Sequence, residues 1–127
     1  MAVERPGQVS DPGRRVPATV AEPPLDEVVG RLVDALGPEQ IYLFGSRARG
    51  DNQPDSDYDF MVIVPQSDLP AHRRAQLAHR ALHGVRIAKD ILVWTRAEFD
   101  RYVPVTASLP ATVVREGRLL YDARSPV

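Results

Sequence analysis

The segment GSRARGDNQPDSDYDF, residues 45–60, contains the side chains of this chain that are best suited to metal-dependent chemistry. Asp57 and Asp59 alternate with other residues at the start of an apolar run, DYDFMVIV. In a strand, alternate side chains share a face, so we expect both carboxylates on one face, about 7 Å apart along the strand. A solvated loop before a strand is the simpler interpretation. The alternative is a phosphoryl-transfer site in which the carboxylates bind two Mg²⁺ ions, which remove the repulsion between the carboxylates.

A glycine-serine turn precedes the two aspartates and is suited to holding phosphate. The apolar run QIYLF, residues 40–44, leads directly into Gly45 and Ser46, where we expect one helical turn that ends at Arg49. The first N–H groups of such a turn have no acceptor within it and carry partial positive charge. Glycine at 45 lets a phosphate approach the backbone, the Ser46 hydroxyl adds a donor, and Arg47 or Arg49 can neutralise charge. The two adjacent features predict a triphosphate site.

A third carboxylate, Asp90, interrupts the apolar run of another expected strand, RIAKDILVW, residues 86–94. A charge inside such a run is rarely buried without a partner. If this strand lies beside the strand of Asp59, Asp90 faces the same metal ions. There it can bind the ion that activates an acceptor hydroxyl, or accept the proton of that hydroxyl. The alternative is an ion pair between Asp90 and an arginine.

The elements that position these residues predict an α/β (α+β) fold, with one mixed sheet of about four strands flanked by helices. Apolar residues from Leu25 to Leu36 follow the helical period, and Gly37 and Pro38 end that helix. Thr95 and Glu98 have the spacing of a capping box that opens a short helix. Helices and strands alternate along the chain, which is typical of helices packed on a single sheet. The other expected elements are helices at about 70–83 and 106–116 and an edge strand at 118–122.

Two groups of basic residues elsewhere in the chain are expected to lie at the surface. His72, His79 and His83 form one stripe of the expected helix at 70–83. They lack the HExxH pattern of a zinc site, so we expect the stripe to face solvent or a partner. The adjacent Arg73 and Arg74 are expected as surface charge.

Length and composition predict a single globular domain preceded by a tail. The chain has 127 residues, of which 43% are hydrophobic and 26% charged. Residues 1–22 contain three prolines and no apolar period, which predicts a flexible tail before a domain at 23–127. The net charge of −1 disfavours bulk nucleic-acid binding. The chain has no cysteine, no apolar run of membrane-spanning length and no signal-peptide pattern, so we expect a cytoplasmic protein without a membrane anchor.

The motif as a whole, GSRARG followed by DNQPD and SDYDF, resembles the signature of the nucleotidyltransferase superfamily, in which ten residues separate Gly-Ser from D-x-D. The short chain and the later segments KDILVWT and VVREGRLLYD resemble the minimal nucleotidyltransferases in particular, over roughly residues 25–122. The resemblance implies a metal-binding catalytic triad and a nucleotide-binding turn. The triad falls on Asp57, Asp59 and Asp90, and the nucleotide-binding candidates are Gly45, Ser46, Arg47, Arg49 and Ser56.

The same resemblance implies Mg²⁺-dependent transfer of AMP from ATP to a hydroxyl group. Minimal nucleotidyltransferases of this kind act as antitoxins of toxin–antitoxin pairs, and transfer AMP to a tyrosine of a separate helical HEPN-type toxin. One alternative is a small-molecule adenylyltransferase of the aminoglycoside type that needs a helical partner. Another is a non-catalytic module that neutralises its partner by contact alone. The sequence leaves open the acceptor, the donor base, the number of nucleotides transferred and the oligomeric state.

Overall fold

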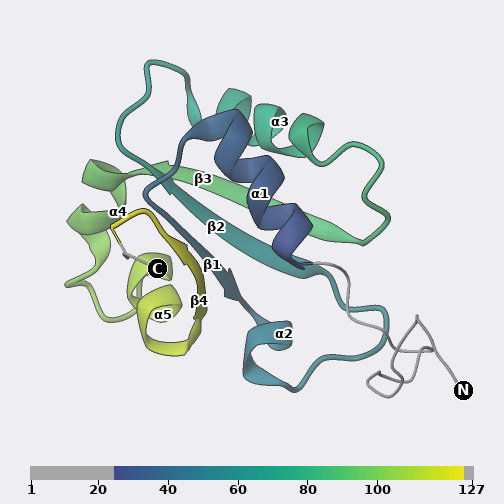
Figure 1. Cartoon of the computed structure of the whole chain (residues 1–127). Coiled ribbons are helices and arrows are strands. Elements are labelled where there is room, and N and C mark those ends of the chain that lie inside the picture. The colour runs from purple at the N-terminus through teal and green to yellow at the C-terminus, as the bar shows by residue number, and fades with distance from the viewer. Residues whose placement is uncertain (1–24, 125–127) are drawn as a thin grey trace, which may run out of the picture.

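The computed structural model describes residues 25–124 and contains a four-stranded mixed sheet (Figure 1). The strand order is β3-β2-β1-β4, so the last strand lies at an edge, as predicted. β1 pairs antiparallel with β2 and β4, whereas β2 and β3 are parallel. The expected mixed sheet of about four strands is therefore confirmed, and the predicted tail at 1–22 lies outside the described residues. The strands are β1 Gln40–Phe44, β2 Tyr58–Val64, β3 Lys89–Thr95 and β4 Arg118–Asp122.

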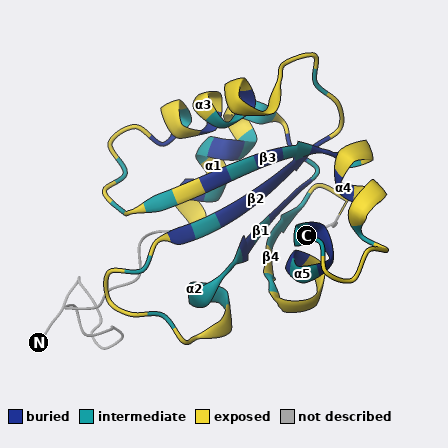
Figure 2. Cartoon of the chain, turned by 180° about the vertical axis from the view of Figure 1, so that it is seen from behind, coloured by how far each residue is buried: buried dark blue, intermediate teal, exposed yellow. Residues whose placement is uncertain are grey.

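Helices cover both faces of the sheet (Figures 1 and 2). The first and third helices pack on one face, and the last two pack on the other. None of the helices between residues 25 and 124 is long and apolar enough to cross a membrane. The helices are α1 Leu25–Leu36, α2 Ser46–Arg49, α3 Ala71–Ala81, α4 Arg96–Tyr102 and α5 Leu109–Glu116.

The central strand β2 divides its side chains between two hydrophobic clusters, and it is buried along almost all of its length (Figure 2). Its even-numbered side chains, from Tyr58 to Val64, pack with α1 and α3. Met61 and Ile63 pack on the other face, against α4 and α5. The predicted alternation is confirmed. Because side chains alternate along a strand, Asp59 belongs to the face of Met61, on the α4–α5 side.

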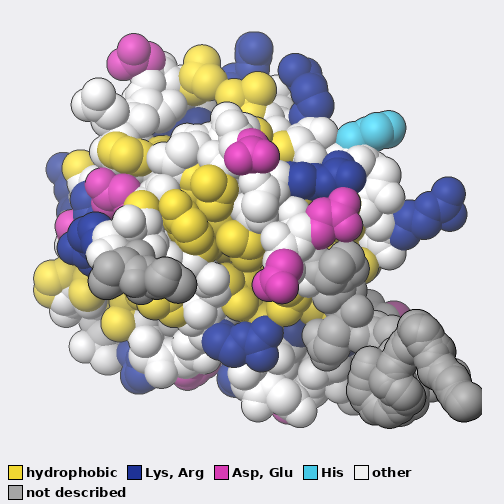
Figure 3. Space-filling view, viewed as in Figure 1, with side chains coloured by type: hydrophobic (Ala, Val, Ile, Leu, Met, Phe, Trp, Pro, Cys, Tyr) yellow, Lys and Arg dark blue, Asp and Glu magenta, His cyan; other side chains and the backbone are white. Residues whose placement is uncertain are grey.

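The face beneath α1 and α3 is incompletely covered beside β4. Figure 3 shows hydrophobic side chains at the surface over the region of α1 and β4. Side chains of both elements pack there against the first cluster while staying partly exposed, among them Val33, Leu36, Leu120 and Tyr121.

Caps fix where the last two helices begin. The predicted capping box at Thr95 and Glu98 is present at the start of α4. The helix α5 begins at Leu109 instead of about 106, because Ser108 takes the N-cap position. The Ser108 hydroxyl accepts a hydrogen bond from the N–H of Ala111 at 3.2 Å, which satisfies one donor of the first turn.

The prediction that Arg74 is surface charge is wrong. Arg73 is exposed, but Arg74 is only 6% exposed and lies between α3, β3 and α4. Its guanidinium donates to the carbonyls of Leu69 and Val93 at 3.0 and 2.6 Å, and forms two bonds with Glu98 at 3.0 and 3.1 Å. These bonds occupy the polar groups of the guanidinium and so offset the free-energy cost of removing its charge from water.

Candidate active site

The sheet register brings two of the three candidate carboxylates into one row. Asp59 of β2 is paired with Asp90 of β3, and on its other side with Phe44, the last residue of β1. Neighbouring strands lie about 4.8 Å apart, and side chains in register point to the same face. The strand neighbourhood expected for Asp90 is therefore confirmed. Asp57 lies two residues before Asp59, directly before β2 begins.

Asp90 differs from its expected environment, because it is exposed rather than buried in an apolar strand. The strand β3 begins at Lys89, three residues later than predicted, so Asp90 is its second residue and lies at the open end of the sheet. The Lys89 ammonium donates to the carbonyls of Val85 and Ile87, at 3.1 and 3.3 Å, which stabilises a non-strand conformation before β3. The exposed end of a strand is accessible to a metal ion and to a substrate.

The three carboxylates form one electrostatic cluster. Partial burial raises the pKa of Asp59 most, and the negative charges of Asp90 and Asp57 raise it further. The positive charge of Arg49 has the opposite, smaller effect on the pKa of Asp59. Folding therefore makes the ionised form of Asp59 less favourable than it is in a free aspartate, and a nearby divalent cation would offset this cost.

The donor chemistry of the cluster fits Mg²⁺, which prefers carboxylate oxygens and shares its coordination sphere with water and phosphate. Within the described part of the chain, no three acidic or histidine side chains already converge as the ligands of one ion. Asp57 and Asp90 are exposed, so their side chains have room to rotate toward an ion. The cluster supplies suitable ligands for a metal ion, but these ligands are not arranged as a preformed cage.

Gly45 brings the turn after β1 against this cluster. Its φ of 79° is in the region that glycine adopts freely and other residues rarely adopt. A Cβ atom at this position would overlap Oδ2 of Asp59, so glycine is also required by close approach. The predicted proximity of the turn to Asp59 is therefore present in the structure.

The turn continues into α2 and leaves backbone donors at its start. The carbonyl of Gly45 accepts from the N–H groups of Ala48 and Arg49, both at 3.1 Å. The N–H groups of Ser46 and Arg47 precede the first intrahelical bond, so they have no acceptor within α2. The expected helical turn at Ser46–Arg49 is confirmed.

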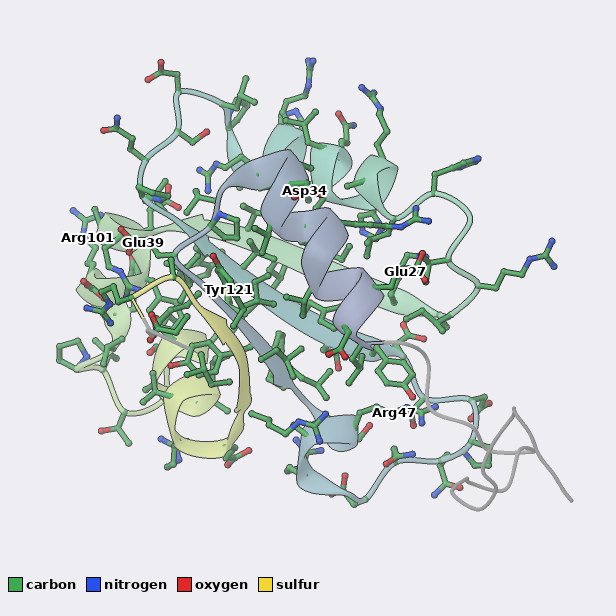
Figure 4. The ribbon with its side chains drawn as sticks, in the orientation of Figure 1. Glu27, Asp34, Glu39, Arg47, Arg101 and Tyr121 are labelled. Atoms are coloured by element: carbon green, nitrogen blue, oxygen red, sulfur yellow. The ribbon has the colours of Figure 1, made fainter. Side chains whose placement is uncertain are left out.

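The two arginines of the turn point to different partners. Arg47 donates to the carbonyls of Pro54 and Ser56 and lies over the Tyr58 ring, with its guanidinium carbon 4.3 Å from the ring centroid. Figure 4 shows Arg47 beside α2, at the end of the sheet where β2 begins. The exposed Arg49 forms an ion pair with Asp51 at 3.1 Å. Sequence analysis missed the contacts of Arg47, although the aromatic residue directly after Asp57 was a usable signal.

The other candidate side chains lie in the loop before Asp57 and on or just after α3. The Ser56 hydroxyl accepts from the N–H of Gln53 at 2.9 Å, within the loop that leads to Asp57. His72, His79 and His83 are all exposed. The structure thus brings Asp57, Asp59, Asp90 and the turn at Gly45 together at one end of the sheet, whereas Ser56 and Arg47 organise the adjoining loop.

A mixed sheet with an acidic cluster beside a glycine-serine turn defines the class of protein. The family model described as "Nucleotidyltransferase domain" matches residues 25–120, and the chain belongs to this family. No curated protein matches the chain.

Solved structures with a similar fold agree with this assignment. A protein from Sulfolobus solfataricus, itself given a nucleotidyltransferase assignment, is 25% identical, with a TM-score of 0.56 over 78% of each chain. A toxin–antitoxin structure with AMP-PNP is 24% identical, with a TM-score of 0.57 over 78% of this chain and 73% of that one. A mutant of the toxin–antitoxin MntA-HpeT is 23% identical, with a TM-score of 0.57 over 81% of this chain and 76% of that one. The two toxin–antitoxin structures show the fold alone.

Proposed function

We propose that this chain is a Mg²⁺-dependent nucleotidyltransferase that transfers AMP from ATP to a hydroxyl group of a partner protein. The observation that carries the proposal is the row in which Asp59 lies in register with Asp90 and touches the turn at Gly45. This arrangement places candidate metal ligands beside backbone N–H donors suited to phosphate, at one end of the sheet.

In the proposed reaction, an acceptor oxygen attacks the α-phosphorus of ATP. A new P–O bond forms, the bond to the departing pyrophosphate breaks, and the hydroxyl proton passes to Asp90 or to water. Two bound Mg²⁺ ions would neutralise charge on the attacking and leaving oxygens, and Asp57, Asp59 and Asp90 would hold these ions. The N–H groups of Ser46 and Arg47, with the Ser46 hydroxyl, would orient the triphosphate, and the exposed Arg49 can reach its negative charge.

The acceptor is proposed to be a tyrosine of a cognate HEPN-type toxin, which would make this chain the antitoxin of a pair. Two solved structures of similar fold are toxin–antitoxin proteins, and one of them contains AMP-PNP. Their identity to this chain is too low to transfer an activity, so these structures support the proposal only as fold relatives.

A transfer assay with labelled nucleotide tests this function. The chain is incubated with Mg²⁺, ATP labelled at the α-phosphate, and the protein encoded beside it; mass spectrometry then locates added AMP. We expect label on a partner tyrosine, and a loss of about 100-fold or more in Asp57→Asn, because removing a carboxylate removes a metal ligand.

Asp68→Asn is the matched control, because Asp68 is exposed and lies in the loop after β2, away from the cluster. It should keep full activity. Label that appears equally with Asp57→Asn, or no label on any partner together with neutralisation by contact alone, would contradict the proposal. Label on a small-molecule antibiotic without a partner protein would instead identify the small-molecule alternative.

A further inference from the structure

Few contacts hold the Asp57 side chain in position. It is exposed, and within residues 25–124 its carboxylate forms no hydrogen bond or ion pair. It precedes β2, so the ladder with β1, which reaches Asp59, does not hold it. Its position must therefore come from its neighbours in the chain.

Arg47 contacts the neighbours of Asp57 on both sides. On the N-terminal side, its Nε and Nη2 donate to the Ser56 carbonyl at 3.2 and 3.1 Å, and Nη2 also donates to Pro54 at 3.0 Å. On the C-terminal side, its guanidinium lies over the ring of Tyr58. A planar guanidinium can make both contacts at once, because it donates within its plane and stacks through its face.

The contacts of Arg47, together with a backbone bond of Tyr58, link the three segments of the candidate site. Arg47 belongs to α2, directly after the turn at Gly45 and Ser46. The N–H of Tyr58 donates to the carbonyl of Ala88 at 2.8 Å, just before the strand that carries Asp90. Tyr58 is 6% exposed and packs in the first hydrophobic cluster, so Arg47 rests on a fixed surface.

We infer that the side chain of Arg47 holds Asp57 in position for metal binding, and that its guanidinium does not bind the nucleotide phosphates. Its three hydrogen bonds to loop carbonyls use Nε and Nη2, and its face is turned to Tyr58. This inference rests on the proposed function for the metal, but its structural part can be tested without activity. Arg49 is exposed, and among residues 25–124 its guanidinium pairs only with carboxylates, so it remains the candidate for phosphate.

The structural part is tested by amide hydrogen exchange of the full chain, without metal or nucleotide. In Arg47→Met and Arg47→Lys, the amides of Ser56 and Tyr58 should exchange faster than in the wild type, because the loop loses its clamp. The amides of β1 should be unchanged. Arg73→Met, which removes an exposed arginine from α3, is the control and should match the wild type throughout. Unchanged exchange at Ser56 and Tyr58 in both Arg47 variants would overturn the inference.

The functional part is tested by titrating MnCl₂ into each protein and measuring free Mn²⁺ by electron paramagnetic resonance. Outer residues that orient metal ligands typically contribute about 10- to 100-fold to metal affinity, so we expect a loss of that size in both Arg47 variants. Lysine keeps the charge but not the planar fork, so Arg47→Lys should not rescue Mn²⁺ binding.

A phosphate-binding role gives the opposite pattern. Mn²⁺ affinity would then be unchanged in both variants, while ATP affinity would fall in Arg47→Met and be retained in Arg47→Lys. That result would overturn the inference and leave the proposed function intact. If the wild type itself binds no Mn²⁺, the proposed function fails, and the role of Arg47 as a metal-site positioning residue fails with it, whatever the exchange data show.

Discussion

At the scale of the residue, Asp59 is the centre of the candidate site. It is half-buried, lies in register with Asp90 and touches the turn at Gly45. Burial and the negative charges of Asp90 and Asp57 raise its pKa above the ordinary value of 3.8. In the folded chain the ionised Asp59 carboxylate is therefore less favourable than in the unfolded chain, and a bound divalent cation would offset this difference.

This cost predicts a pH-dependent effect of Asp59→Asn on stability. A carboxyl whose pKa is raised by folding binds protons more readily in the folded state, so without metal its contribution to stability falls as the pH rises above about 3.8. At pH 7 without divalent ions, Asp59→Asn should raise the melting temperature. The difference should shrink toward zero as the pH falls below the ordinary aspartate pKa.

Thermal unfolding at several pH values, with and without MgCl₂, measures this effect. Mg²⁺ should stabilise the wild type and have a much smaller effect on Asp59→Asn, because only a ligand that binds the folded state adds stability. Asp68→Asn should behave as the wild type at every pH. A destabilised Asp59→Asn at pH 7 would show that Asp59 is a structural ion-pair partner instead.

Sequence alone located the aspartates better than it located the arginines around them. The positions of Asp57 and Asp59 follow from alternation in one strand, a local pattern. The contacts of Arg47 with Ser56 and Tyr58 depend on how a loop folds back onto a helical turn, for which no local period exists. The same reason explains Arg74, whose partners Val93 and Glu98 are 19 and 24 residues away.

At the scale of the element, periodic segments were predictable and their ends were less so. The stripe from Leu25 to Leu36 gives α1 with the bounds expected from its period and from the breakers that follow. The start of β3 was placed too early because apolar residues before Lys89 resemble a strand. The contacts of Lys89 with the preceding carbonyls hold that segment in another conformation.

Arg74 joins three elements, which gives a stability prediction at this scale. Arg74→Met should destabilise the fold by about 2–3 kcal/mol, because the buried carbonyl of Val93 loses its side-chain donor. The loss should not be larger, since the Glu98 side chain is 46% exposed and regains hydration. Urea unfolding followed by far-UV circular dichroism measures the difference.

Arg73→Met is the matched control, because it removes an exposed arginine from the adjacent position of α3. Its effect should lie within about 0.5 kcal/mol of zero. Equal effects of the two substitutions would show that the bonds of Arg74 do not stabilise the fold.

At the scale of the whole molecule, the sheet topology brings together segments that are distant in the sequence. The antiparallel pair β1–β2 places the turn at Gly45 beside Asp59, and the parallel neighbour β3 adds Asp90. The helices α4 and α5 cover the other end of this face, and no helix within residues 25–124 lies over the beginnings of β2 and β3 there (Figure 2). An open site of this kind suits an acceptor presented by another protein.

Calorimetric titration with a non-hydrolysable ATP analogue, with and without Mg²⁺, tests the central claim most directly. We predict that Mg²⁺ tightens nucleotide binding by the wild type at least about tenfold, because Asp57 and Asp59 would hold a metal ion that also attracts the negative phosphates. In a double variant with Asp57→Asn and Asp59→Asn, Mg²⁺ should give no such gain. Equal affinity of the wild type with and without Mg²⁺, or an equal gain in the double variant, would contradict the account.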